Sequence, residues 1–107
     1  MKLNVKTAYI NETCILRAYK YMNDRVALQL ISLKGEPVAR ITVNVEDAKL
    51  NDDDVCIKDY SENAGMLDAM INAGVVAPPH REIAQGFVNI PVCRLLIKPE
   101  ELNKKES

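Results

Sequence analysis

The residues with the most reactive side chains in this sequence are three cysteines and a single histidine. A thiol enzyme needs a cysteine within hydrogen-bond reach of such a histidine, in an electropositive and partly open site. Cys56 and Cys93 instead stand between aliphatic residues, Cys14 lies in a further apolar run, and His80 follows two prolines. The odd count and wide spacing predict buried free thiols in a reducing cytoplasm, without a disulfide framework and without cysteine–histidine catalysis.

A second group of residues that could do chemistry is acidic. Between positions 46 and 62 the chain carries seven acidic residues and two lysines, a net charge of −5, whereas the rest of the chain carries +4. A calcium loop needs oxygen ligands at alternate positions, a central glycine and a closing glutamate, and this stretch lacks that spacing. Zinc ligand spacing is missing as well. We therefore expect no metal and no other cofactor. Two interpretations stay open for Asp52, Asp53 and Asp54: a solvated acidic turn, or an imitation of a phosphate backbone that binds a partner's basic groove.

A third group combines aromatic and basic residues. Alternation along two expected strands places them on the outer side of a sheet: Arg17, Tyr19, Tyr21 and Arg40, with Lys20 nearby. Proteins that bind single-stranded nucleic acid stack bases on aromatic side chains beside cations. The alternative is the ordinary polar face of a sheet that is buried on one side only. A net charge of −1 argues against a generally basic nucleic-acid binder and leaves room for a local patch.

The scaffold for these side chains contains one segment with helical periodicity. Four residues recur at the spacing of one helix face and predict a helix over about 62–73: Leu67, Met70, Ile71 and Gly74. Ser61 or Asn63 is the expected N-terminal cap. Before this helix, alternating apolar and polar residues predict a first strand over 2–10. Three more strands, joined by short turns, are predicted to form an antiparallel meander: 13–22, 25–33 and 38–45. Residues 87–97 form a last β-prone stretch, which Pro91 either places at a sheet edge or splits in two.

This order of elements predicts an α+β domain over residues 1–98, with an antiparallel sheet of four to five strands and the helix packed on one face. We expect residues 99–107 to form a charged, flexible tail. The length of 107 residues and the hydrophobic share of 48% fit one globular domain. No run approaches the roughly 18 apolar residues of a membrane span, and the first residues lack the apolar core of a signal peptide. These features predict a cytoplasmic protein without a membrane partner.

Two stretches resemble a known family. The first is Gly35-Glu36-Pro37 followed by Thr42-Val43-Asn44 (GEP…TVN), and the second joins Asp59-Tyr60-Ser61-Glu62-Asn63 to the GFVNIPV segment at 86–92. Together they are similar to short uncharacterised proteins, with a domain of unknown function, from phages and mobile elements of gut bacteria. The resemblance covers about positions 25–97. It implies a small α+β domain without assigned activity or catalytic residues, and it favours accessory roles such as binding a host protein.

Two functional hypotheses follow from the sequence. The first is a non-enzymatic accessory protein that binds another protein, with a possible homo-oligomer formed through an edge strand. Its expected contact residues are Asp52, Asp53 and Asp54. The alternative is a small nucleic-acid-binding module that uses the face of Arg17, Tyr19, Tyr21 and Arg40.

Overall fold

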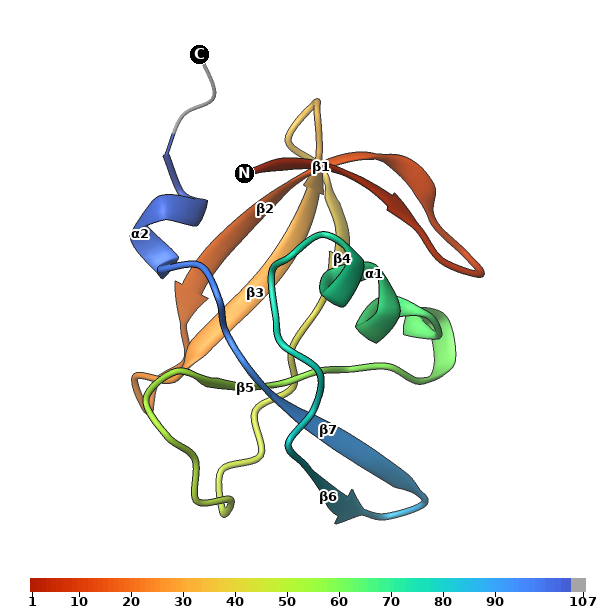
Figure 1. The fold of residues 1–107 in the computed structure, drawn as a ribbon. Coiled ribbons are helices and arrows are strands. Elements are labelled where there is room, and N and C mark those ends of the chain that lie inside the picture. Colours follow the sequence, from red (N-terminus) through yellow and green to blue (C-terminus); the bar gives the residue numbers. More distant parts are fainter. Residues whose placement is uncertain (105–107) are drawn as a thin grey trace.

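The computed structural model describes residues 1–104, and its first half is a four-stranded antiparallel sheet. The strands pair in chain order: β1 (Lys2–Lys6), β2 (Asn11–Lys20), β3 (Val26–Ser32) and β4 (Pro37–Arg40) (Figure 1). Short turns join the later strands, as in the hydrogen bond from the Ser32 N–H to the Glu36 carbonyl at 2.8 Å. The expected meander is therefore present.

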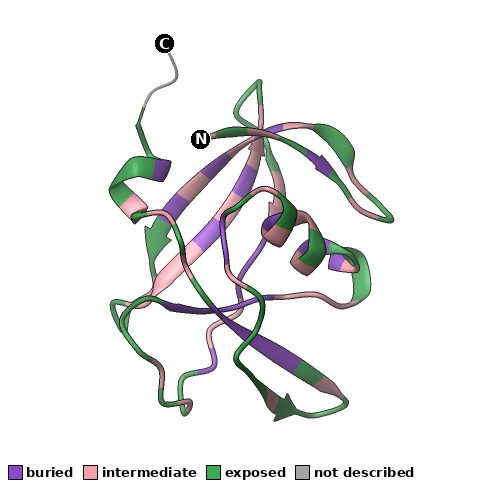
Figure 2. Ribbon diagram, viewed as in Figure 1, coloured by how far each residue is buried: buried purple, intermediate pink, exposed green. Residues whose placement is uncertain are grey.

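Alternation along β2 and β3 decides which face of this sheet is buried. Leu16 pairs with Leu30 across the two strands, and both side chains are fully buried. Arg17 pairs with Gln29 and lies on the opposite face, because neighbouring residues of a strand point to opposite sides. Figure 2 shows the resulting bands of buried and more exposed residues along β2.

Three further strands form a second antiparallel sheet. They are β5 (Asp54–Cys56), β6 (Arg81–Gln85) and β7 (Val88–Arg94), in the order β5-β7-β6. A bridge between Thr42 and Ile57 and a hydrogen bond from the Val43 N–H to the Cys56 carbonyl connect this sheet to the chain that leaves β4. The expected α+β class is confirmed. The strands, however, divide between two sheets instead of forming one sheet of four to five strands.

Pro91 lies in β7, the unbroken central strand of the second sheet, so the prediction that it marks a sheet edge or splits the strand is wrong. Its carbonyl accepts the Ile57 N–H at 3.0 Å, which shows that the backbone of Pro91 faces the β5 side. The β5–β7 ladder ends one pair earlier, at Cys56 and Val92. The N–H that proline lacks would therefore point beyond the end of the ladder. The edge strands of this sheet are β5 and β6; the Val43 N–H bonds the outer side of β5, whereas β6 pairs only with β7.

The helix α1 (Met66–Asn72) is shorter than the expected 62–73 and follows a separate 3-10 turn, η1 (Ser61–Asn63). Gly65 separates the two because its φ of 96° is a left-handed conformation that a continuous helix does not contain. Met66 and Met70 are the fully buried residues of α1. The buried stripe is thus displaced from the expected one, which began at Leu67.

The N-terminal cap of α1 also differs from the prediction. Neither Ser61 nor Asn63 makes the capping hydrogen bond; the Leu67 N–H instead donates to Asp59 Oδ1 at 2.9 Å. Asn63 is buried, and its side-chain amide donates to the Arg40 carbonyl at 2.6 Å. Asn63 therefore links η1 to the end of β4.

Residues 99–104 differ from the expected flexible tail. They include a short helix, α2 (Pro99–Leu102), in which Leu102 is fully buried. The side-chain amide of Asn103 bonds both backbone groups of Ala18 in β2, each at 2.9 Å. The ordered chain therefore continues past the expected boundary at residue 98. Residues 105–107 of the expected tail lie outside the described residues.

Two hydrophobic clusters fill the molecule. The larger joins the inner face of the meander to α1 and to Leu102, and the smaller lies where the second sheet meets the chain around Val43 and Leu50. Within residues 1–104, no helix is both long enough and apolar enough to cross a membrane.

Candidate functional site

The three consecutive aspartates have two different environments. Asp52 and Asp53 are exposed, whereas the Asp54 side chain is almost completely buried. His80 Nε2 donates to Asp54 Oδ1 at 2.8 Å, and the Asn51 N–H donates to Asp54 Oδ2 at 3.0 Å. Asp54 therefore binds within the molecule. Of the three expected contact residues, only Asp52 and Asp53 are exposed, and the role of all three in contacting a partner stays a prediction.

The Asp54 carboxylate stays ionised although it is buried. Burial raises its pKa, but the hydrogen bonds from His80 and the Asn51 N–H, with the charges of His80 and Arg81, lower it below the usual 3.8. His80 lies in an exposed position, as expected, with 44% of its side chain accessible. It holds Asp54 from there, a contact across 26 residues of chain that the sequence does not reveal.

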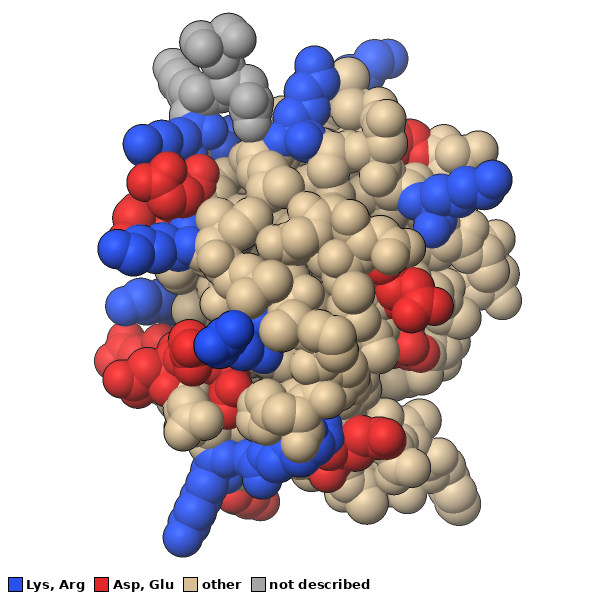
Figure 3. Space-filling view, viewed as in Figure 1, with Lys and Arg blue, Asp and Glu red and all other residues tan. Residues whose placement is uncertain are grey.

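Asp52 and Asp53 border an apolar groove of about 280 Å³. Among the described residues, neither carboxylate takes part in an ion pair. Three chain segments line the groove: Val26 at the start of β3, the two aspartates, and the stretch Leu95, Leu96, Ile97, Lys98 and Pro99. Leu96 is 48% exposed. In Figure 3 a cluster of acidic side chains lies at the left edge, over the chain that leads into β5.

Backbone hydrogen bonds hold the walls of this groove in place. The Leu95 N–H donates to the Asp53 carbonyl at 2.7 Å, and the Leu96 N–H donates to the Val75 carbonyl at 2.9 Å. Leu95 and Ile97 pack against the larger hydrophobic cluster. The groove therefore combines a fixed apolar wall with two exposed negative charges. The charges were predictable from the sequence but the wall was not, because residues 95–97 belong to the predicted β-prone stretch 87–97 and their neighbours across the groove come from distant parts of the chain.

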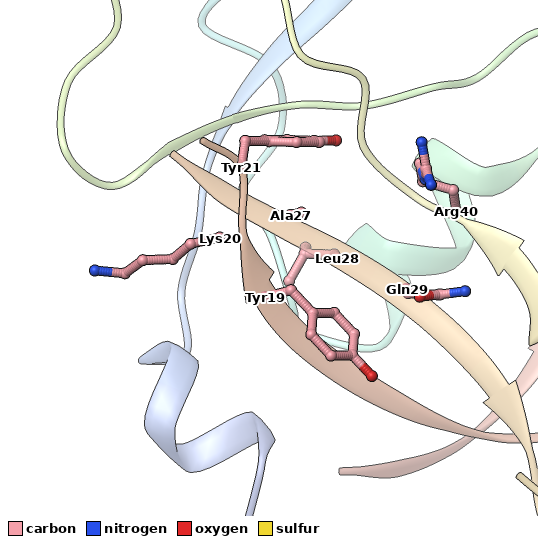
Figure 4. A pocket seen from close by; sticks show the side chains of 7 residues that line it. All are labelled: Tyr19, Lys20, Tyr21, Ala27, Leu28, Gln29 and Arg40. Atoms are coloured by element: carbon pink, nitrogen blue, oxygen red, sulfur yellow. The ribbon is translucent and has the colours of Figure 1, made fainter. Parts of the chain in front are cut away.

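The expected aromatic and basic face is also assembled. Arg17, Gln29 and Arg40 lie side by side across β2, β3 and β4, and Tyr19 pairs with Ala27 one rung away. A hollow of about 260 Å³ lies on this face, and Arg17 is not part of its lining (Figure 4). The hollow is lined by Tyr19, Lys20, Tyr21, Ala27, Leu28, Gln29 and Arg40. Tyr19 is 51% exposed. Tyr21 is half-buried, and its hydroxyl hydrogen bonds with Thr42 Oγ1 at 2.8 Å.

The three cysteines are buried and free, as expected. Burial raises the pKa of all three thiols, and that of Cys93 rises to about 11 with a further contribution from the neighbouring Cys56. Because the thiolate is the reactive form, these thiols are poor nucleophiles near neutral pH. Within residues 1–104, no three Cys, His, Asp or Glu side chains are grouped so that they could hold a metal ion.

Comparison of the chain with protein-family models, with curated proteins and with solved structures gave no match. The geometry of the two surfaces therefore supplies the basis for a functional proposal.

Proposed function

We propose that this protein is a non-enzymatic accessory protein that binds another protein through the groove beside Asp52 and Asp53. The observation that supports the proposal is the pair of exposed carboxylates, without an ionic partner in the described chain, next to an apolar wall. A protein interface has an apolar centre and a polar rim, and opposite charges across the rim select the partner. The segment that fits is a short peptide with an apolar side chain beside Lys or Arg.

The non-enzymatic part of the proposal rests on the reactive residues themselves. The thiols are buried with raised pKa values, and His80 is engaged by Asp54. The resemblance to phage and mobile-element proteins would assign the accessory role to such an element in a bacterial cytoplasm. A homo-oligomer formed through an edge strand is a further proposal, and β6 is the strand of the second sheet whose outer edge is unpaired.

The test is capture of a partner from nuclease-treated bacterial lysate with tagged wild-type protein, followed by quantitative mass spectrometry. The double variant Asp52→Lys with Asp53→Lys should lose the captured protein, because it reverses both rim charges. The control is Glu46→Lys with Asp47→Lys, which makes the same charge change on exposed residues outside the groove. A partner lost equally from both variants, or retained by both, would contradict this site.

A second variant separates the apolar contribution from the charges. Leu96→Ser removes an exposed side chain from the groove wall without changing the net charge. We expect it to weaken capture of the same partner, because the apolar centre of an interface supplies much of its affinity. If the partner is lost with the aspartate variant but retained by Leu96→Ser, the contact is purely electrostatic and the groove is not the binding site.

A further inference from the structure

The outer face of the first sheet is basic, although the whole protein has a net charge of −1. The register of β1 to β4 identifies the residues that share the side of Arg17. Four cations occupy these outward positions: Lys2, Lys6, Arg17 and Arg40. The other outward residues are uncharged, and no Asp or Glu is among them: Asn4, Asn11, Thr13, Ile15, Tyr19, Ala27, Gln29, Ile31 and Pro37.

Three of these four cations have no acidic side chain paired with them among residues 1–104. These three are Lys6, Arg17 and Arg40. Arg17 Nη1 donates to the carbonyl of Asn103 at 3.5 Å, a long contact that leaves its charge intact. Guanidinium groups offer several donors in a plane that matches phosphate oxygens. The face therefore has cations on three of its four strands, β1, β2 and β4, that are available to an anionic ligand.

Groups suited to bases share this face with the cations. Tyr19 is half-exposed at the hollow shown in Figure 4, and Gln29 stands between Arg17 and Arg40 on the middle strand. An aromatic ring stacks on any base, and a glutamine amide both donates to and accepts from a base edge. Ile15 and Ile31, paired across β2 and β3, add a half-buried apolar strip to the same face.

We propose that the outer face of the β1–β4 sheet binds single-stranded nucleic acid, with phosphates on Lys6, Arg17 and Arg40 and a base stacked on Tyr19. A duplex fits less well, because its bases are already stacked and its major groove admits a helix or a narrow ribbon more readily than a four-stranded sheet. This site is separate from the groove beside Asp52 and Asp53 and does not depend on the proposed protein partner.

The experiment is fluorescence anisotropy of a labelled oligothymidylate of about 12 nucleotides, a length within the range that one small domain covers. Contacts with about three phosphates of a single strand predict a salt slope of about −2 on logarithmic axes. The affinity should therefore fall on the order of 20-fold between about 0.05 M and 0.2 M salt. Absence of an anisotropy change up to about 100 µM protein at the lower salt concentration would overturn the proposal, because even non-specific complexes form in this range.

Three variants locate the site on the sheet. The double variant Arg17→Glu with Arg40→Glu should weaken binding at least tenfold, and Tyr19→Ala should weaken it about fivefold or more through lost stacking. The matched control, Lys34→Glu with Lys49→Glu, reverses two exposed charges outside the outward set and should change affinity far less. Circular dichroism and thermal unfolding of each variant confirm that the sheet is folded. Equal losses in the double variant and its control would overturn the assignment to this face.

Two competitors distinguish single-stranded nucleic acid from other polyanions. An unlabelled single strand should compete at lower concentration than a duplex of the same length or polyaspartate. Preference for the duplex, or equal competition by polyaspartate with no effect of Tyr19→Ala, would show a general anion surface and would overturn the proposal.

Discussion

Asp54 has a partner for each of its carboxylate oxygens, His80 on Oδ1 and the Asn51 N–H on Oδ2. These bonds connect the start of β5 to the chain that enters β6, so that one side chain aligns both strands flanking β7. The lowered pKa of Asp54 shows that the folded protein prefers the ionised carboxylate. A group with a lowered folded-state pKa contributes stability above its ordinary pKa and loses that contribution as the pH falls.

Asp54→Asn should therefore lower the free energy of unfolding at pH 7 by about 1–3 kcal/mol, because a buried amide has one oxygen and cannot accept both hydrogen bonds that the carboxylate accepts. The difference from wild type should shrink as the pH falls below the ordinary value of 3.8, where wild-type Asp54 itself becomes protonated. Urea unfolding followed by circular dichroism at pH 7 and pH 3 measures both quantities. Asp53→Asn, at the exposed neighbour, is the control and should be nearly neutral. A difference that grows on acidification would contradict the assignment.

The thiols allow a second prediction at the scale of single residues. Their raised pKa values and burial predict that Ellman's reagent leaves the native protein unlabelled at pH 8 and modifies all three cysteines in urea. The thiol contribution to stability should be present below the ordinary pKa of 9.0 and decline as the pH rises toward the folded-state value of Cys93, about 11. Rapid labelling of any one cysteine in the native protein would show that this thiol is accessible to solvent and would contradict its assignment as buried.

Among the elements, α1 depends on residues that precede it by several positions. Gly65 provides the left-handed turn into the helix, and a Cβ at this position would lie 3.3 Å from the Cβ of Thr7. The carboxylate of Asp59 then caps the first turn by accepting the Leu67 N–H. A negative charge at the start of a helix is also favoured by the helix dipole.

Asp59→Ala should lower the free energy of unfolding by about 1 kcal/mol, the usual effect of losing a capping side chain. Ser61→Ala is the matched control, because Ser61 was the cap expected from sequence and its side chain makes no capping bond. Chemical denaturation of the two variants beside wild type measures the difference. A larger loss for Ser61→Ala than for Asp59→Ala would restore the cap expected from sequence.

The elements differ in how far their own residues specify them. The meander was predictable because alternation with period two is a local property, and the same alternation placed Arg17, Tyr19 and Arg40 on one face. β6 was not predictable in this way, since it follows two prolines and gains its structure from pairing with β7. The internal role of Asp54 was not predictable either, because its hydrogen bond with His80 exists only in the tertiary fold.

At the scale of the whole molecule, charge of opposite sign is concentrated on different surfaces. The outward side of the meander is basic, while Asp52 and Asp53 project beside the groove near the start of β3. The molecule measures 37 × 29 × 23 Å, a few times the Debye length of about 8 Å at physiological salt. The two surfaces therefore influence each other at low salt and become nearly independent at higher salt.

This separation predicts how one surface responds to mutation of the other. In Asp52→Lys with Asp53→Lys, each substitution adds two charges, so the net charge rises from −1 to +3. At about 0.01 M salt, where the Debye length is about 30 Å, this variant should bind the labelled single strand more tightly than wild type by a factor of about two to five. The gain should vanish near 0.15 M salt, because screening then limits the effect to contacts within about 8 Å. Glu46→Lys with Asp47→Lys changes the net charge equally and should give a similar gain at low salt. A loss of oligonucleotide binding in the first variant alone would mean that the groove and the basic face form one site, and the assignment of separate ligands to them would be wrong.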